Sequence, residues 1–421
     1  MSKMKKKKRH IGRKILFGVE IVVLLLLVGA LFVYAQINKK MDKLDMKDDE
    51  KQELQVQMNE NISGNEVLSG YTNIALFGID KRATDGGYGN SDTEMIASIN
   101  NDTKEVRIVS LYRDTYMRVD EDSEGNGIYK KCNAAFNIGG PEKAISMMNT
   151  NLDLDIQDYV AVDFSAMSKI VDCLGGLDIP LTYQEIIHTN NYCKGTSEET
   201  GTSYDPIPIP DPKPENEAEI YGTYHLNGVQ VTSYCRIRQT ASMDMGRTER
   251  QRRVLGLLAE KAKKSSLTTL LNVLDEVFPM VQTSFSKSEL IKLGSSILSY
   301  KFGETIGFPA SYVMGPEVTK PVTGLDCLIP TTLEVNVRYL HEFLFASEAY
   351  EPSDTVKIRS DFVADKTGFG NTSVKEEWQR FVKERTEEVS DDTSGEESDI
   401  YTEEDYDGYS DDGSYEVDGE Y

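Results

Sequence analysis

Six arginines fall within the twenty residues from Tyr234 to Arg253, and their spacing is the first sign of chemistry in this sequence. Arg236 and Arg238 are two residues apart, so on a predicted strand their side chains would point to the same face. Gly246 suggests a break, after which a helical apolar stripe is formed by Val254, Leu255, Leu258 and Ala262. Above that stripe, at helical spacing, lie Arg247, Arg250 and Gln251. The pattern predicts a strand and a helix start that aim several guanidinium groups at one point.

Guanidinium groups that converge in a folded domain repel one another unless an anion lies between them. A forked guanidinium matches phosphate oxygens two at a time, and the N-terminus of a helix also favours an anion. The cluster therefore favours a phosphate or pyrophosphate site. The alternative is a solvated, basic start of a helix with Asp244 as its N-cap.

Acidic residues and another arginine stand at the ends of predicted strands. Residues 73–80 fit a buried strand that ends on Asp80, and Asp92 follows a glycine-rich loop. Residues 94–100 and 106–112 predict a hairpin that leads into Arg113-Asp114. Open α/β sheets bind ligands at strand ends, and hard carboxylates beside phosphate oxygens suit Mg²⁺. The sequence contains no Walker loop, no dinucleotide fingerprint, no zincin motif and no serine-nucleophile motif.

The elements that must position these groups alternate between strands and helices. Helices are predicted after Lys131-Cys132-Asn133, from Gly140-Pro141, over 165–174, over 267–278, from Ser286 and over 340–345, and strands over 159–164 and 177–181. Residues 331–337 fit a short strand or a helix start. Residues 184–224 predict an exposed loop, because their dense prolines exclude a helix and a central strand. This alternation with one hairpin predicts an α/β fold: a three-layer α/β/α sandwich around a mixed central sheet.

An apolar run over residues 15–35 predicts an N-terminal transmembrane helix, since it would span roughly 31 Å. Eight lysines and arginines precede this run, which predicts a cytoplasmic N-terminus and an extracellular body. A cleaved signal peptide ending at Ala35 is the alternative, although the run is long for a signal core.

Charge divides the remaining chain. The net charge is −24, yet residues 1–14 carry +8, and sixteen acids with no base follow Arg385. This balance argues against a nucleic-acid binder, because phosphate-backbone binding needs a broad basic surface. The predicted organisation is a cytoplasmic basic tail (1–14), a transmembrane anchor (15–35), an extracellular stalk (36–70), a catalytic domain (71–350), a C-terminal extension (351–385) and a disordered acidic tail (386–421).

The five cysteines contain no C-x-x-C pair, which excludes a zinc knuckle. An extracellular location permits a disulfide, and the odd number leaves at least one thiol free.

These features together resemble the LytR–CpsA–Psr family of cell-wall assembly enzymes. The resemblance covers roughly residues 71–264 and extends towards Phe345. It is carried by an ordered series: Leu76-Phe-Gly-Ile-Asp80, Ser91-Asp-Thr93, Ser110-Leu-Tyr-Arg-Asp114, Lys131-Cys-Asn-Ala-Ala135, Leu174-Gly-Gly176, Leu226-Asn-Gly228, and then Arg236, Arg238, Asp244, Arg247, Arg250 and Gln251. One such motif would be weak evidence, whereas the series in this order is specific.

The resemblance implies an extracellular phosphotransferase that binds a glycopolymer linked to polyprenyl pyrophosphate and transfers it to a peptidoglycan hydroxyl. It implies that Asp80 and Asp92 hold Mg²⁺. The pyrophosphate would be bound by Arg113, Arg236, Arg238, Arg247 and Gln251, with support from Lys131 and Arg250. Asp92 and Asp114 are candidates for the base, although Asp114 can instead orient Arg113. An apolar slot for the lipid is also expected, with Met147, Met148, Phe164, Met167 and Ile170 as candidates for its lining or for ordinary core.

Two other functions compete with transfer. A hydrolase would use the same ions to cleave lipid pyrophosphates with water, and a non-enzymatic surface or regulatory protein would use the arginines only to bind anionic polymer. Magnesium dependence separates the binding protein from the enzymes, and transfer to glycan separates the transferase from the hydrolase.

Overall fold

The structure is a computed structural model that describes residues 53–62, 64–80, 88–238, 243–266, 269–270, 273, 276–277, 280–286, 289, 293, 299–346 and 350–370. The side chains of Asp80, Asn90, Met243 and Asp244 lie outside this description. The predicted membrane helix (15–35) and acidic tail (386–421) also lie outside it. Among the helices of the described residues, none is long and apolar enough to cross a membrane.

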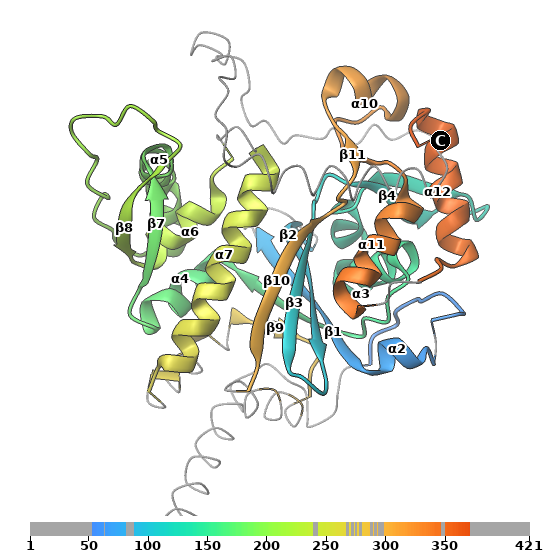
Figure 1. Cartoon of the computed structure of the whole chain (residues 1–421), viewed down its shortest axis with the longest axis horizontal. Coiled ribbons are helices and arrows are strands. Elements are labelled where there is room, and N and C mark those ends of the chain that lie inside the picture. Colours follow the sequence, from blue (N-terminus) through green and yellow to red (C-terminus); the bar gives the residue numbers. More distant parts are fainter. Residues whose placement is uncertain are drawn as a thin grey trace, which may run out of the picture. The chain divides into compact units, whose positions relative to one another are not determined.

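A mixed sheet of six strands runs through the described part of the chain (Figure 1). Its order is β10 (Lys301–Phe308), β3 (Glu105–Leu111), β2 (Asn90–Asn100), β1 (Tyr71–Asp80), β6 (Asp158–Asp163) and β9 (Gln282–Thr283). The pairs β1–β2, β2–β3 and β6–β9 are antiparallel, whereas β1–β6 and β3–β10 are parallel. The predicted first strand, hairpin and mixed sheet are confirmed. Asn100 fixes the hairpin turn, because its side chain accepts hydrogen bonds from the backbone of Asp102 and Thr103.

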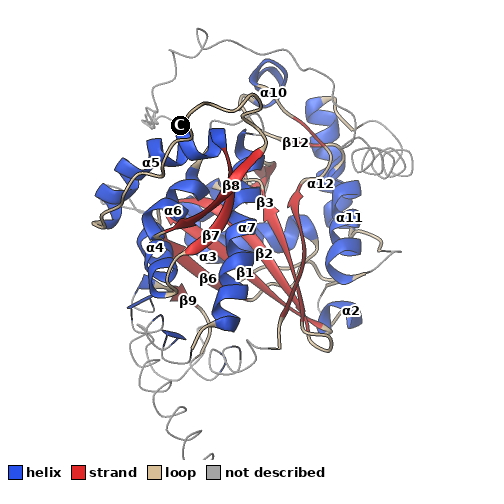
Figure 2. Cartoon of the chain, turned by 60° about the vertical axis from the view of Figure 1, so that its left-hand side comes forward, coloured by secondary structure: helices blue, strands red, loops and turns tan. Residues whose placement is uncertain are grey.

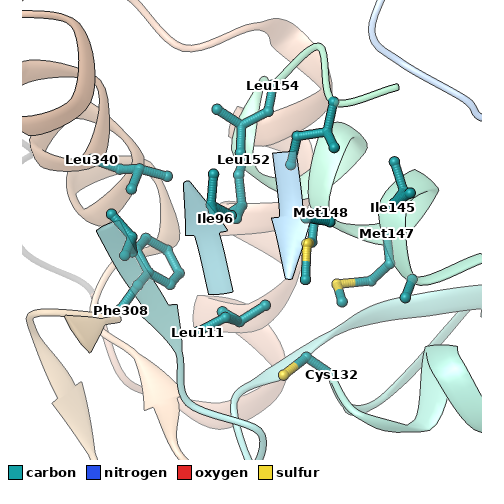
Figure 3. Packing of buried hydrophobic residues seen from close by; sticks show 14 of the residues in the cluster. Ile96, Leu111, Cys132, Ile145, Met147, Met148, Leu152, Leu154, Phe308 and Leu340 are labelled. Atoms are coloured by element: carbon teal, nitrogen blue, oxygen red, sulfur yellow. The ribbon is translucent and has the colours of Figure 1, made fainter. Parts of the chain in front are cut away.

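Helices α3 (Ala134–Leu152) and α11 (Leu333–Phe345) pack on one face of this sheet. Figure 3 shows this core, in which Met148 of α3 and Leu340 of α11 lie with Ile96 and Leu111 from the strands. The predicted break before Pro141 is present as a kink in α3. Gly140 at the kink has a φ of 64°, and a Cβ there would lie 2.6 Å from the ring of Tyr88.

Helix α7 (Met243–Lys264) covers the opposite face, where Leu255 packs with Ile74 and Ile108. A second core lies beside the sheet. It is built from α4 (Phe164–Cys173), β7 (Leu177–Thr182), α5 (Tyr183–Thr200), β8 (Ile220–Leu226), α6 (Gly228–Arg236) and part of α7. Figure 2 shows helices on both sides of the strands, in agreement with the predicted layers.

The predicted loop over 184–224 is partly wrong, because most of its first half is helix α5 and its end belongs to strand β8. Helix α5 starts with a capping box, in which Thr182 and Glu185 exchange side-chain and backbone hydrogen bonds. The helix is polar, so its apolar stripe is faint. The proline-rich stretch lies in the connection to β8, which pairs antiparallel with β7.

Several elements were not assigned from the sequence. They are the two edge strands β9 and β10 of the central sheet, α2 (Glu66–Ser69), the hairpin of β4 (Tyr116–Glu121) and β5 (Gly127–Lys131), the pair β11 (Tyr312–Val313) and β12 (Ile329–Pro330), α10 (Pro316–Thr323) and α12 (Asp354–Thr367). The alternative of a helix start near residue 331 is confirmed, because Thr332 caps α11. Ser286 and Glu289 form a capping box where a helix is predicted to start, and the described residues of 267–278 are helical.

Both flanks of the predicted catalytic domain pack against it. Before β1, Gln57 donates its backbone N–H to Ser146 of α3 at 3.0 Å, and Ile62 and Leu68 are buried in the core. After α11, Val356 of α12 lies in the same core. The end of the predicted stalk and the start of the predicted extension are therefore parts of the folded unit.

All five cysteines are free in the structure, so no disulfide links them. Cys132, Cys193, Cys235 and Cys327 are buried, and Cys173 is half-buried. The folded unit is held by its apolar cores instead.

Candidate active site

Asp92 occupies a β-bulge at the start of β2. Gly78 of β1 pairs with Thr93 and Ile79 pairs with Ser91, so Asp92 is the extra residue on its strand. Bulges re-aim side chains and often lie beside active sites. Gly78 allows the close approach of the strands here, since a Cβ at this position would lie 2.9 Å from the Thr93 Cβ.

Three guanidinium groups converge on Asp92. Arg113, which follows β3, forms an ion pair with Oδ1 of Asp92. Arg238, which follows α6, places Nη2 3.4 Å from Oδ1 and 3.5 Å from Oδ2. Arg247 of α7 is 2% exposed and donates from Nη2 to the backbone oxygen of Asp92 at 3.1 Å. The structure thus brings together four of the predicted site residues from separate elements.

The electrostatics of the cluster follow from this geometry. Burial pushes the pKa of Asp92 upward, but the charges of Arg113, Arg247 and Arg238 outweigh burial and leave the pKa below its ordinary value. Asp92 is therefore ionised at neutral pH. Arg113 and Arg238 contact the carboxylate and Arg247 the backbone oxygen of Asp92, so one negative charge faces three cations. The cluster therefore retains positive charge that can bind a further anion.

Asp114 and Lys131 hold the other side of Arg113. Lys131 at the end of β5 lies 3.0 Å from Oδ1 of Asp114, and Nε of Arg113 lies 3.7 Å from Oδ2. Cys132, which follows Lys131, also holds the segment that carries Arg113, because its thiol lies 3.2 Å from the carbonyl oxygens of both Tyr112 and Arg113. This arrangement suits Asp114 for orienting Arg113.

The predicted strand through Arg236 and Arg238 is wrong, because Arg236 is the last residue of helix α6. Asn227 caps this helix in a capping box with Gln230, and these caps override the β-branched and aromatic residues that favoured a strand. Arg236 consequently faces α5, where Nη1 lies 2.9 Å from Glu199 and 3.1 Å from Thr196. Its guanidinium also lies over the ring of Phe164, 4.6 Å from the centroid.

Arg250 and Gln251 lie on α7, as predicted, and both donate hydrogen bonds to carbonyl groups at the end of α6. Arg250 is 6% exposed, donates to the Ile237 carbonyl at 2.8 Å and lies 3.6 Å from Glu185. Gln251 donates to the Cys235 carbonyl at 3.3 Å. These contacts position the segment that carries Arg238.

The predicted break and N-cap before this helix are also wrong. Helix α7 begins at Met243, so Asp244 lies within its first turn and Gly246 is helical. Glycine lowers helix propensity but does not end a helix that is anchored by packing, and Gly246 is buried.

Asp80 is the last residue of β1, and its backbone pairs with Asn90 on the strand that leads into Asp92. Its side chain lies outside the described residues. Two hard carboxylates on neighbouring strands fit the oxygen chemistry that Mg²⁺ requires. The described residues contain no group of three or more His, Cys, Asp or Glu side chains that would hold a metal by themselves.

Glu94 was missed by the sequence interpretation. It is 1% exposed, and neither carboxylate oxygen has a hydrogen-bond partner among the described residues. Burial raises its pKa to about 8, although the neighbouring Cys132 thiol acts in the opposite direction. By distance the thiol is hydrogen-bonded to the carbonyls of Tyr112 and Arg113 rather than to Glu94. The sequence signal that could have identified Glu94 is an acidic residue at a core-facing position of a central strand.

The candidate lipid-slot residues divide into two groups. Met147 and Met148 are buried in the core between α3 and the sheet. Phe164, Met167 and Ile170 of α4 are half-buried, and the last two pack against the second core.

The model of the LytR_cpsA_psr family matches residues 31–309, and the chain belongs to this family. A polyisoprenyl-teichoic acid–peptidoglycan teichoic acid transferase TagU of Enterococcus faecalis is 28% identical over 290 residues, which cover 67% of this chain and 82% of the relative. The TagU of Oceanobacillus iheyensis, with the same transferase name, is 27% identical and matches 73% of this chain and 92% of its own length.

The fold is shared with solved structures. A crystal structure of a protein from Streptococcus agalactiae has a TM-score of 0.52 at 20% identity, over 70% of this chain and 92% of that protein. At this level of identity the likeness is one of fold.

Proposed function

We propose that this chain is a membrane-anchored, extracellular phosphotransferase. It moves an anionic glycopolymer of the teichoic acid or capsular polysaccharide type from polyprenyl pyrophosphate to a hydroxyl of peptidoglycan. The observation that most directly supports this proposal is the convergence of Arg113, Arg238 and Arg247 on Asp92 at the β-bulge. Membership of the LytR_cpsA_psr family and the transferase names of the relatives support the same reaction.

The reaction is a phosphoryl-type transfer between two oxygens. The acceptor hydroxyl oxygen attacks the phosphorus that bears the polymer, a new P–O bond forms, and the P–O bond to the lipid phosphate breaks. Polyprenyl phosphate leaves, and the hydroxyl loses its proton. Catalysis of such a step consists mainly of positioning and of stabilising negative charge on the phosphate oxygens.

The residues of this chain would supply both effects. Arg113, Arg238 and Arg247 would bind the pyrophosphate oxygens, with Arg236 and Gln251 as further predicted ligands and Lys131 and Arg250 in support. The lowered pKa of Asp92 makes its carboxylate a weak base, so it is better suited to organising charge than to removing a proton.

Asp80 and Asp92 would hold Mg²⁺ through their carboxylate oxygens. When bound, the ion would neutralise charge on the phosphate oxygens. Asp92 would then exchange part of its contact with the arginines for the metal, which leaves those guanidinium groups available for the pyrophosphate.

A membrane anchor over residues 15–35 fits a substrate whose lipid remains in the bilayer. Eight basic residues before this run support a cytoplasmic N-terminus and an extracellular domain. In that location the domain would meet both the lipid-linked donor and peptidoglycan.

The test uses the full-length chain in micelles with a polyprenyl-pyrophosphate-linked saccharide and peptidoglycan oligomers, with Mg²⁺ or with a chelator. Wild type is compared with Arg238→Ala and with Arg338→Ala as the matched control. Arg338 is a half-buried arginine on α11, paired with Glu334 and Glu351. We expect saccharide on the glycan only with Mg²⁺, and a loss on the order of 100-fold only in Arg238→Ala.

Other outcomes distinguish the alternatives. Release of lipid phosphate without glycan product would identify a hydrolase. A chain that binds anionic polymer but leaves the donor intact would be a surface binding protein, and either result would reject the transferase.

A further inference from the structure

A second basic site lies apart from the Asp92 cluster, in a pocket with a volume of about 180 Å³. It is lined by residues of β4, α3 and α12 and of the segment before α2, among them Arg118, Asp120, Glu121, Lys143, Thr150 and Arg359. At roughly 30 Å³ for each water, it has room for about six waters, or for a phosphate group with parts of the alcohols that it joins. It shares no residue with the arginine cluster.

Arg359 of α12 is the unusual member of this pocket. It is 8% exposed, and its Nε is buried without a hydrogen-bond partner among the described residues. Its Nη1 donates to Oγ1 of Thr150 at 2.9 Å, which fixes the guanidinium without neutralising it. Within the described residues, no carboxylate forms an ion pair with it.

A second guanidinium lies near Arg359. Burial and, next, the positive charge of Arg118 together lower the pKa of Arg359 to about 10, against the opposing effects of Tyr129 and Asp153. A buried cation next to another cation is costly, because desolvation and repulsion both disfavour its charge. Binding of an anion would relieve both.

The other charged groups of the pocket are already paired. Arg118 lies 3.0 Å from Glu121, and Lys143 forms an ion pair with Asp120. Three cations and two acids line the pocket, so its formal charge is 3 − 2 = +1. The two acids disfavour a dianion, whereas a phosphodiester carries a single negative charge and matches this balance.

We propose that this pocket binds one phosphodiester group, with Arg359 as its principal ligand and Lys143 and Arg118 at its sides. A forked guanidinium suits two phosphate oxygens at once. Arg359 lies beyond residues 31–309, so the pocket is not contained in the part of the chain that the family model matches.

The source of the diester is a repeating unit of the anionic glycopolymer, and only this identification rests on the proposed function. A second binding point would hold the polymer along the surface while its lipid-linked end occupies the Asp92 cluster. Binding at both points would raise the effective concentration of the chain end at the cluster.

The experiment measures the binding of diglycerol phosphate by the full-length protein in neutral detergent, with glycerol as the uncharged comparison. The variants are Arg359→Gln, Lys143→Gln, Arg238→Ala and the matched control Arg338→Gln. We expect Arg359→Gln to weaken diester binding at least about ten-fold and Lys143→Gln about three-fold. Arg338→Gln should bind as wild type does, and glycerol should not bind. Arg238→Ala should keep the component of diester binding that Arg359→Gln loses.

Three results would overturn the proposal: no diester binding by wild type, binding lost in Arg238→Ala but kept in Arg359→Gln, or equal binding of glycerol. If Arg359→Gln fails to fold, the half-exposed Lys143→Gln decides, and unchanged affinity there rejects the site. Failure of the proposed function would appear separately, as absence of transfer by a wild type that still binds the diester.

Discussion

Two carboxyl groups on β2, only two residues apart, lie in opposite electrostatic surroundings. Asp92 is at the bulge among three arginines, and its pKa lies below its ordinary value. Glu94 is opposite Phe77 and Leu111 in the apolar core on the α3 side, and burial raises its pKa to about 8. One acid is therefore charged at neutral pH while the other is largely protonated.

The bulge explains how close neighbours come to differ so much. On a regular strand, residues two apart share a face, so Asp92 would follow Glu94 into the core. The extra residue shifts the alternation, and Asp92 instead meets Arg247 from α7 on the other side of the sheet. A change of one residue in register thus separates a binding site from a buried, neutral acid.

Among the substitutions considered, Asp92→Asn should have the largest effect on transfer activity. The amide keeps the shape but removes the negative charge that the arginines share, and it removes a proposed ligand of Mg²⁺. We expect the transfer kcat/KM to fall about 1,000-fold, or about 4 kcal/mol. Steady-state transfer assays measure it, with Asp102→Asn in the exposed hairpin turn as the control. Activity near the wild-type level in Asp92→Asn would place the reaction elsewhere.

Glu94→Gln tests whether Glu94, the buried acid of the pair, is protonated in the folded protein. Folded Glu94 keeps its proton up to about pH 8, whereas an unfolded glutamate loses it near 4.5. Between these values the folded state binds more protons, so the free energy of unfolding falls as pH rises. His341, whose pKa burial lowers from 6.5 to about 4, has the opposite effect, but only below 6.5. The window from 6.5 to 8 therefore isolates Glu94.

In that window we expect wild type to lose about 2 kcal/mol that Glu94→Gln retains, at about 1.4 kcal/mol for each pH unit. Urea unfolding of the full-length protein at both ends of the window measures the slope. Comparing how the free energy of unfolding changes with pH in the two proteins removes the pH-independent cost of burying the glutamine amide. Parallel slopes in the two proteins would show that Glu94 is ionised in the folded state.

The contrast between these acids also marks what could be predicted from the sequence. Strands β1, β2, β3, β6 and β7, the hairpin and the apolar stripe of helix α7 follow from apolar periodicity. The sequence also indicates Arg113, Arg238, Arg247 and Asp92 as site residues. The bulge was not predictable, because inserting one residue into a ladder depends on the partner strand. The environment of Glu94 was missed for the same reason, since burial of both faces of a strand is a tertiary property.

Helix caps account for other differences. Residues 229–235 contain Val229, Val231, Thr232 and Tyr234, which favour a strand by propensity, but the Asn227–Gln230 capping box starts a helix. Arg236 therefore faces Glu199 rather than Asp92. Helix α5 was hidden by its polar composition, although its capping box at Thr182 and Glu185 was readable.

Arg113→Lys sharpens the Asp92 side of the comparison. Arg113 pairs with Asp92 and lies 3.7 Å from Asp114, and the planar guanidinium serves both through different nitrogens. Lysine keeps the charge but is a single point of contact. We expect a fall of about ten-fold in kcat, roughly 1.4 kcal/mol, with little change in unfolding free energy. Full activity in Arg113→Lys would mean that only the net charge at this position matters.

Cys132→Ala should have the smallest effect and tests whether the two regions act independently. The thiol is buried beside Glu94, and it also lies 3.2 Å from the carbonyl of Arg113, so it touches both environments. Removing it should cost about 1 kcal/mol of unfolding free energy, while kcat changes less than about three-fold, because Lys131 and Asp114 still hold Arg113. Urea unfolding and the transfer assay measure the two quantities. A fall of ten-fold or more in kcat with intact stability would mean that the thiol couples the core around Glu94 to the arginine cluster.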